Sequence, residues 1–513
     1  MSIARKILEN TFVQVLGRLV TAACSIVILK IISGYLGAAG YGDYTTVYQF
    51  LAFFGVAADF GIYTITVKEM SKDETKIPMI LANVMGLRTA LIIVAMGAAV
   101  AVAFLVPQYH KTAISLGVLI STFATFFTLL NGTVSSVLQV HLKMQYATIG
   151  QIIGKIVSVA YIAAVAYVLF VDNTIIGFYH LLGAGVMANF VQFAITTYYV
   201  RRYTKITYRF DWAFWKHIFF TSLPYGVALV LSTIYFRLDV ILLTLILPHT
   251  TAAPDGTAKC AKAMCGDTEV GLLGVAMRML EVLIVVPIYF MNSVLPVMTR
   301  FIEEQSEKVK TLMQYSFDFL AATAMPLLVG GFILAAPIIR FISDPEFLSG
   351  HKYVYGSDLA VKILMFAMLF SFINALFGFT LVVLNKQIKL MYINAACVFF
   401  NLIGNLVTIP IWGFRGSAVT SVLSEFFILI MTYHVVRKAL GFHLSLRTTA
   451  RIAVSAVLMG AVVWFGFYWM QNVWYIWQLS ILVPLGAAAY GIMMLTTKAI
   501  TPEMWELLKR KAA

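Results

Sequence analysis

Charge is scarce in this chain of 513 residues. Only 12% of the residues are Asp, Glu, Lys or Arg, whereas about a quarter are charged in a typical soluble protein. Hydrophobic residues make up 61%, and the mean hydropathy is +0.89. No long polar segment separates the apolar stretches, which excludes a sizeable soluble domain. The composition therefore predicts a polytopic membrane protein.

Cysteine is also scarce, and several signatures are missing. Four cysteines are too few for a disulfide scaffold. The phosphate-binding pattern G-x-x-x-x-G-K-[ST] does not occur, so we do not expect direct coupling to ATP. The start, MSIARKILEN, is not followed by a short apolar region with a small-residue cleavage site, and we expect the first span to be retained. The apolar runs lack the alternation of a membrane β-barrel, which leaves helices.

Fourteen apolar stretches have the length, about 20 residues or more, that a membrane helix needs. They are 11–36, 44–67, 79–105, 112–140, 146–170, 174–199, 218–247, 270–298, 315–342, 358–384, 388–411, 416–436, 449–470 and 476–497. The predicted fold class is an all-α integral membrane protein with about 14 transmembrane helices.

Lysine and arginine are distributed unevenly between the loops. The loops and termini on the side of the N-terminus hold 24 of them, and the opposite loops hold 6. The positive-inside rule then predicts that both termini are cytoplasmic, and we expect a multi-pass protein of the cell (inner) membrane. The net charge of +14 is explained by loops that face anionic lipid headgroups, so no nucleic-acid partner is implied.

The sequence also shows weak signs of duplication. YGDYTTVYQFL (41–51) and VGLLGVAMRML (270–280) each place a glycine just before a span, the second and the eighth. LKMQY (142–146) precedes the fifth span much as LNKQI (384–388) precedes the eleventh. We expect six-helix bundles in 1–205 and 206–440, related by a pseudo-two-fold axis, and two additional transmembrane helices with a cytoplasmic tail in 441–513.

Five stretches, taken in order, carry a resemblance to a known family. They are LGAAGYGDYTTVYQF (36–50), ADFGIYTITVKEMSKD (58–73), FRLDVILL (236–243), VGLLGVAMRMLEVLIVVP (270–287) and NLIGNLVTIPIWGFRGSAVTSVLSE (401–425). Together they resemble the polysaccharide transporter, or Wzx-type flippase, branch of the MOP superfamily (multidrug/oligosaccharidyl-lipid/polysaccharide exporters). The resemblance implies two bundles around a central cavity that opens alternately to each side. It also implies a substrate made of an oligosaccharide on a polyprenyl pyrophosphate.

Ionisable side chains inside the spans are the candidate functional residues, because burying charge in a membrane is costly and such groups face a cavity or a partner. Arg237 and Asp239 are two positions apart on one predicted helix, about 200° around its axis, and so cannot pair with each other. Arg278 and Glu281 are three apart, and a local ion pair is an equally good interpretation of them. We set aside Lys30 and Asp318, which lie near span ends and can reach the membrane surface.

The remaining charges suggest two roles. The substrate-binding candidates are Arg18, Arg88, Arg237, Arg278, Lys155 and Lys362, because cationic side chains suit a pyrophosphate and guanidinium groups bind phosphate oxygens bidentately. The ion-coupling candidates are Asp59, Asp239, Glu425 and Glu281, which offer sites for protons or sodium. Against both roles stands the alternative that these charges only fix helix packing. No cofactor, metal or catalytic residue is implied.

Three other functions remain open. A multidrug or cation exporter of the same superfamily would need a net acidic cavity, whereas the spans hold more cations than anions. A lipid II flippase also needs a cationic cavity, but its first-helix pattern is absent here. A membrane-embedded glycosyltransferase or polymerase would need a large external domain with catalytic carboxylates. The external loops 248–269 and about 343–357 are short and carry no paired acids, so we do not expect an enzyme.

Cys260 and Cys265 share the external loop 248–269, which is longer than the resemblance leads us to expect. In an oxidising outer compartment they can form a disulfide, and two free thiols are the alternative. The expected partners are a lipid-linked oligosaccharide and the bilayer, with the glycan-assembly enzymes as candidates. We expect a monomer.

Overall fold

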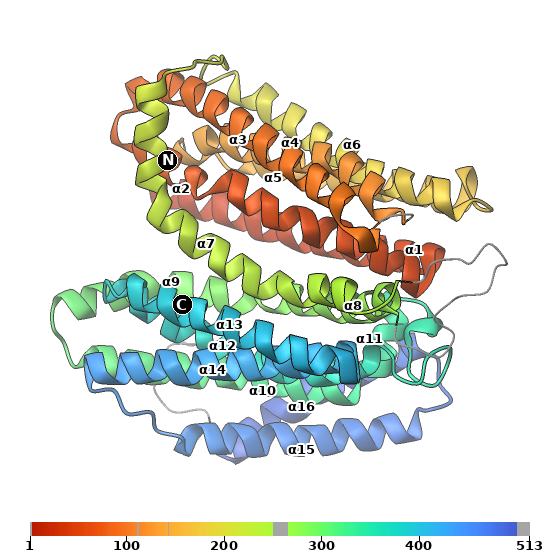
Figure 1. The fold of residues 1–513 in the computed structure, drawn as a ribbon. Coiled ribbons are helices and arrows are strands. Elements are labelled where there is room, and N and C mark those ends of the chain that lie inside the picture. The colour runs from red at the N-terminus through yellow and green to blue at the C-terminus, as the bar shows by residue number, and fades with distance from the viewer. Residues whose placement is uncertain (1–2, 110–111, 142, 250–264, 500–513) are drawn as a thin grey trace. The chain divides into compact units, whose positions relative to one another are not determined.

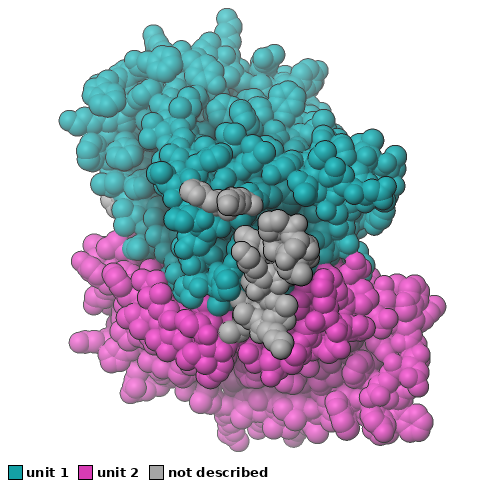
Figure 2. Space-filling view, turned by 45° about the vertical axis from the view of Figure 1, so that its right-hand side comes forward, with its two compact units in different colours: residues 1–271 teal, residues 272–513 magenta. Residues whose placement is uncertain are grey.

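The computed structural model describes residues 3–109, 112–141, 143–249 and 265–499, and within these ranges it contains helices and short connections without a β-strand (Figure 1). The chain divides into two compact units, residues 1–271 and 272–513 (Figure 2). The division falls inside helix α8 (Gly266–Leu283), whose first turn belongs to unit 1.

Unit 1 is built from seven α-helices, the first turn of α8 and three short helical turns in its described residues. The helices are α1 (Ile3–Asp59), α2 (Ile62–Lys72), α3 (Ile77–Leu105), α4 (Ile114–Val140), α5 (Gln145–Ala164), α6 (Thr174–Val200) and α7 (Trp212–Ile246), with the turns η1 (Glu74–Lys76), η2 (Pro107–Tyr109) and η3 (Val165–Leu169). The helix α6 packs against α4 and α5, while α1 contacts α3, α4, α5 and α7.

Unit 2 contains the rest of α8 and eight further α-helices in the described residues. They are α9 (Val285–Glu303), α10 (Lys308–Ile333), α11 (Ala335–Ile342), α12 (Ser357–Val383), α13 (Gln387–Trp412), α14 (Phe414–Leu440), α15 (Arg447–Trp469) and α16 (Tyr475–Thr496), with the short turn η4 (Pro345–Phe347). The helix α12 lies against α9, α10 and α14, and α15 joins α10 to α16.

The helix α1 reverses direction at Gly37, whose φ of 67° and ψ of −177° lie in a region that only glycine adopts readily. Before this residue, Gly17 packs against Thr148 in the first turn of α5, and the Tyr35 hydroxyl donates to the carbonyl of Phe170, beyond the far end of the same helix. The first half of α1 therefore runs along α5 in the same direction.

The second half of α1 runs back along α7. Asp43 contacts His249, just beyond the last turn of α7, whereas the ring of Phe60 stacks on Phe219 near the start of α7. The single element α1 is thus a hairpin of two antiparallel helices with one residue at its tip.

The helices confirm the predicted all-α membrane fold. Twelve stretches of the described residues are long and apolar enough to cross a membrane. The first, Val20–Lys72, contains two predicted spans on either side of Gly37, and α7 covers the predicted span 218–247. Each of the fourteen predicted spans therefore lies on helix.

Two predicted spans, 270–298 and 315–342, are each divided between two helices, and proline explains both breaks. The helix α8 ends at Leu283 and α10 ends at Ile333, each four residues before a proline, Pro287 or Pro337. Proline has no N–H to donate to the carbonyl four residues earlier, so the helical ladder is interrupted there.

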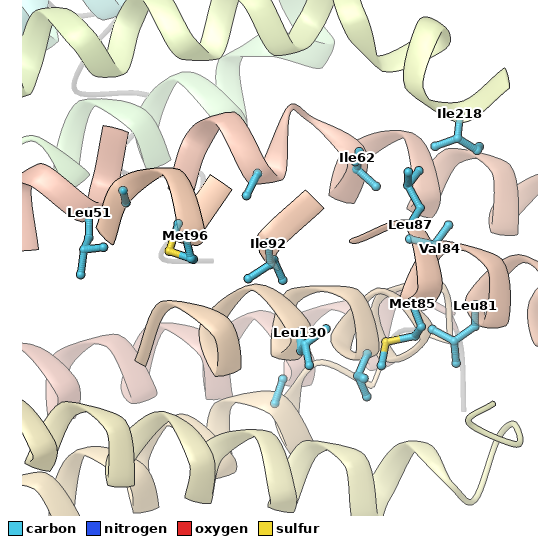
Figure 3. Close-up of a cluster of buried hydrophobic side chains, with 14 of the residues drawn as sticks. Leu51, Ile62, Leu81, Val84, Met85, Leu87, Ile92, Met96, Leu130 and Ile218 are labelled. Carbon is cyan, nitrogen blue, oxygen red and sulfur yellow. The ribbon is translucent and has the colours of Figure 1, made fainter. Parts of the chain in front are cut away.

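The core of unit 1 is a continuous cluster of buried apolar side chains (Figure 3). Leu51 of α1, Ile62 of α2, Leu81 of α3, Leu130 of α4 and Ile218 of α7 all belong to it. Lipid tails are as apolar as these side chains, so close packing rather than transfer from water stabilises such a core.

The helix α7 packs with unit 1, on α1, α2 and α3, although we expected it to begin the second bundle at residue 206. The connection before it explains this placement. The backbone N–H of Arg209 donates to the carbonyl of Ala82 at 3.0 Å, and Asp211 N–H donates to Asn83 Oδ1 at 3.2 Å. Trp215 Nε1 donates to the carbonyl of Asn83 at 3.0 Å, so α7 begins on the first turns of α3. The division into two repeated bundles stays a prediction.

The last two helices attach to unit 2 through apolar and polar contacts. Leu334, Met459, Val463 and Leu482 form a buried cluster between α11, α15 and α16. The Tyr490 hydroxyl of α16 donates to a carbonyl of α10 at 2.8 Å.

Asp318 of α10 completes this attachment. Its carboxylate accepts from Thr449 Oγ1 of α15 at 3.3 Å and from Gln314 Nε2 at 3.2 Å. We expected this side chain to reach the membrane surface, but it is buried. That expectation is wrong, because hydroxyl and amide donors satisfy the carboxylate inside unit 2.

Candidate functional site

Arg237 lies on the face of α7 that meets α1. Its Nη1 donates to Oε1 of Gln49, a buried side chain on the second half of α1. Arg237 is partly exposed, whereas Asp239, two residues further along, is buried. The different surroundings agree with the expectation that these two side chains point to different sides of the helix.

Arg88 is the most enclosed of the predicted cations, with 2% of its side chain exposed. Its Nη2 forms an ion pair with Oδ1 of Asp59 at the end of α1, and its Nη1 donates to Oγ1 of Thr133 on α4 at 3.1 Å. Gly132 of α4 lies beside the guanidinium. The structure thus brings together one predicted cation and one predicted anion, and a ligand could reach Arg88 only if this pair opened.

The other two predicted cations of unit 1 lie on neighbouring helices. Arg18 is exposed on the first half of α1, next to Gly17, which packs against α5. Lys155 is partly buried on α5. The helices α1 and α5 are in contact.

The two predicted cations of unit 2 form separate local pairs. Arg278 Nη1 lies 2.7 Å from Glu281 Oε2, so the local ion pair that we considered is present, with both side chains about half exposed. Lys362 Nζ lies 4.0 Å from Asp358 Oδ2, one turn away on α12. Such local pairs contribute little to stability.

Glu425 belongs to a buried polar group between α12, α13 and α14. Its Oε2 accepts from Asn374 Nδ2 at 2.6 Å, and the same amide nitrogen donates to the Glu425 carbonyl at 2.9 Å. Next to it, Asn401 Nδ2 donates to Ser424 Oγ at 3.4 Å, and Asn405 Nδ2 donates to Asn401 Oδ1 at 2.9 Å. Asn374 of α12 thus holds Glu425 of α14, and Asn401 links α13 to α14 beside it.

A cluster that the sequence did not predict lies where the second half of α1 begins and α7 ends. His249 Nε2 is 2.8 Å from Asp43 Oδ1, and His249 Nδ1 is 3.8 Å from Asp267 Oδ2. Asp43 lies in the YGDY stretch that carries the family resemblance, but the resemblance alone assigns it no role. His249 and Asp267 lie just outside the predicted spans, whereas the candidate functional residues were the ionisable side chains inside the spans.

The cysteine prediction falls partly outside the described residues. Cys260 lies in 250–264, and Cys265 directly precedes α8. Gly266 N–H donates to the carbonyl of Pro248 at 2.8 Å, so the two ends of the loop 248–269 meet. The Cys260–Cys265 disulfide stays a prediction.

The loop 343–357, which we predict to be external, is held together by Asp358. Its Oδ1 accepts from the backbone N–H and the hydroxyl of Ser349 at 2.8 and 2.7 Å. Glu346 Oε2 accepts from Lys352 Nζ at 3.1 Å, and this hydrogen bond raises the pKa of Lys352. The loop is therefore ordered, while Val354 within it is 77% exposed.

A family model described as "Polysaccharide biosynthesis protein" matches residues 7–302, and the MatE model matches 260–407. No curated protein matches the sequence.

Several solved structures share the fold. The lipid II flippase MurJ, in an inward closed conformation, is 14% identical, with a TM-score of 0.70 over 96% of this chain and 99% of that one. An inward-facing multidrug resistance MATE transporter is 14% identical, with a TM-score of 0.62 over 84% and 98%. A MOP superfamily transporter from Pyrococcus furiosus is 14% identical, with a TM-score of 0.56 over 85% and 95%.

These matches define the class of protein: a multi-pass membrane transporter or flippase of the MOP superfamily. Within that class, the chain belongs to the polysaccharide biosynthesis protein family, whose model covers more than half of its length.

Proposed function

We propose that this protein moves a polyprenyl-pyrophosphate-linked oligosaccharide, the repeat unit of a polysaccharide or O-antigen, from the cytoplasmic to the outer leaflet by alternating access. The observation that carries the proposal is the match of residues 7–302 to the polysaccharide biosynthesis family. A hydrophobic lipid carrier with a charged headgroup also suits a helical protein whose spans contain arginine.

The charges of unit 1 support an anionic substrate. Arg18 is exposed and Arg237 is partly exposed, and Gln49 holds the Arg237 guanidinium through a neutral amide oxygen. A guanidinium binds two phosphate oxygens at once and keeps its proton. Lys155, Lys362, Arg88 and Arg278 remain further candidates for contacts with the headgroup.

The membrane potential gives the transport a direction. Moving negative charge outward across an inside-negative membrane is favourable by about 2.3 kcal/mol per charge per 100 mV. The potential could thus assist export, and Asp59, Asp239, Glu281 and Glu425 would be candidates for coupling to protons or sodium. We propose that both termini are cytoplasmic and that the protein works as a monomeric transporter rather than an enzyme.

Lipid II is the second candidate substrate, favoured by the TM-score of 0.70 to the lipid II flippase over nearly the whole of both chains. The MATE structures leave about 15% of this chain uncovered. A multidrug or cation exporter is also disfavoured by the excess of intramembrane cations, because organic cations need acidic surroundings.

The test is a flipping assay with purified protein in liposomes. Fluorescent polyprenyl-pyrophosphate oligosaccharide and fluorescent lipid II are each placed in both leaflets, and an impermeant quencher reports how much crosses from inside. We expect the oligosaccharide carrier to cross faster than lipid II, with a further increase under an imposed potential. Crossing no faster than in protein-free liposomes contradicts the proposal, and faster crossing of lipid II favours the second candidate.

A further inference from the structure

His249 lies between two carboxylates from two other elements of unit 1. Asp43 comes from the second half of α1 and Asp267 from the first turn of α8, whereas His249 follows the end of α7. The side chains of His249, Asp43 and Asp267 are 8%, 16% and 3% exposed. One imidazole therefore connects three separate segments in a nearly dry environment.

The backbones around this cluster approach unusually closely. A Cβ on Gly42 would lie 1.7 Å from the carbonyl oxygen of Asp267, and a Cβ on Gly271 would lie 1.9 Å from the carbonyl oxygen of Ala38. Neither position has room for a side chain. The glycines bring α1 and the first turn of α8 together beside the imidazole, so a change in the cluster bears directly on this helix contact.

The charge balance of the cluster depends on the histidine. Among the described residues of unit 1, the Asp43 carboxylate also acts on two tyrosines: Tyr109 of η2, which hydrogen-bonds Thr244 at 3.3 Å, and Tyr179 of α6. Phenols are neutral near pH 7, so they add no charge. A neutral imidazole leaves two buried carboxylates facing each other, whereas a protonated imidazole reduces the net charge from −2 to −1.

We propose that His249, Asp43 and Asp267 form a proton-binding site that fastens α1 to the α7–α8 connection. A protonated imidazole donates from both ring nitrogens, whereas a neutral one donates from one nitrogen and turns a lone pair toward the other carboxylate. Binding takes one proton from water onto a ring nitrogen, and release returns it to water. No other bond changes.

This inference rests on the proposed flippase function, because it assigns the proton as coupling ion to a site separate from Asp59, Asp239, Glu281 and Glu425. In the predicted orientation, the cluster is at the outer end of the helices. Proton binding from outside then holds α1 against α8, and proton release loosens the contact. Alternating access requires such a contact to form and break in each cycle.

The first test measures protonation without any substrate. Histidine-labelled protein in nanodiscs is titrated by NMR, and the His249 signal is assigned by its loss in His249→Gln. Asp43→Asn should move the midpoint of this titration to lower pH by about one unit or more, and Asp267→Asn should move it less. The exposed His351 is the matched control, because its signal should keep its midpoint in both variants. An unchanged His249 midpoint in both variants overturns the proton site.

The second test measures coupling in the liposome flipping assay with an imposed pH gradient. The gradient should accelerate substrate flipping by the wild-type protein and by His351→Gln. Asp267→Asn and His249→Gln should flip the substrate at a rate that the gradient no longer changes. Equal stimulation of all four proteins, or none in the wild type, overturns the coupling. If the wild type does not flip at all, the proposed function fails, and the NMR midpoints still decide whether the site binds a proton.

Discussion

At the scale of single residues, the intramembrane cations of unit 1 differ in how accessible they are. Arg18 is exposed, Arg237 is partly exposed beside Gln49, and Arg88 is enclosed with Asp59. An accessible guanidinium can meet a ligand directly, whereas an enclosed ion pair stabilises the arrangement of the helices that supply it. The same residue type therefore supports two different predictions.

Arg237 should be required for transport. Arg237→Lys keeps the charge but loses the bidentate fork, so we expect a partial loss of flipping, and Arg237→Ala should abolish flipping while the protein is still produced and folded. The liposome assay with lipid-linked oligosaccharide measures both. Arg300→Ala is the control, because Arg300 is exposed near the end of α9 and pairs locally with Glu304. Normal flipping by Arg237→Ala would mean that this arginine only packs against its neighbours.

Arg88 and Asp59 should act as a pair in stability. Arg88→Met leaves a carboxylate without its cation, and we expect a loss of about 3 kcal/mol or more in the free energy of unfolding. The double variant Arg88→Met/Asp59→Leu should recover part of that loss. The exposed pair of Lys72 and Glu69, with N and O 2.7 Å apart, is the control, and Lys72→Met should change stability by less than about 1 kcal/mol. Unfolding midpoints in one detergent measure all three, and equal losses for both single variants would contradict the pairing.

The sequence predicted part of this residue-level picture. Two-residue spacing on a helix is enough to separate Arg237 from Asp239, and three-residue spacing is enough to bring Arg278 to Glu281. The partner of Arg88 depends on which helices adjoin, which spacing along one helix does not determine. The His249 cluster joins α1 to segments more than 200 residues further along the sequence, and all three of its members lie outside the predicted spans.

At the scale of helices, glycine decides where backbones meet. Gly42 and Gly271 lie at the contact of α1 with the first turn of α8, while Gly97 on α3 has nothing within 4 Å of its would-be Cβ. Glycine in a membrane helix commonly marks such a close approach. The structure thus distinguishes positions that have room only for glycine from positions that also have room for a side chain.

Gly271→Ala should therefore destabilise the protein, because the added methyl group would lie 1.9 Å from the Ala38 carbonyl oxygen and the helices must move apart. We expect a cost of about 1–3 kcal/mol, measured as a lower unfolding temperature. Gly97→Ala, the matched control, should be neutral or slightly stabilising, because alanine has the higher helix propensity. Equal effects of the two substitutions would show that the α1–α8 contact does not limit stability.

The helices themselves were largely predictable, since an apolar run of membrane length has few alternatives to a helix. Their interruptions were less so. Apolar sequence continues through Leu283 and Ile333, and the breaks there follow from prolines four residues later. The packing of α7 on unit 1 depends on hydrogen bonds from Arg209 and Asp211 to α3, which hydropathy does not encode.

At the scale of the whole molecule, the basic residues predict which ends of the helices face the cytoplasm. Single cysteines in a cysteine-free background should report this. Val354→Cys, on the exposed part of the second external loop, should react with an impermeant maleimide on intact cells. Lys205→Cys, exposed between α6 and α7, should react only after permeabilisation. The reverse pattern would overturn the orientation and place the His249 cluster on the cytoplasmic side.

The one-residue tip of the α1 hairpin limits how the length of the chain can vary among relatives. An extra residue there has no loop to occupy, so it would rotate the following helix by about 100° and advance it by about 1.5 Å. Asp43, Gln49 and Asp59 would then all turn away from His249, Arg237 and Arg88 in one step. Insertions and deletions should therefore be excluded at Gly37, which makes this position a fixed point for aligning distant members of the family.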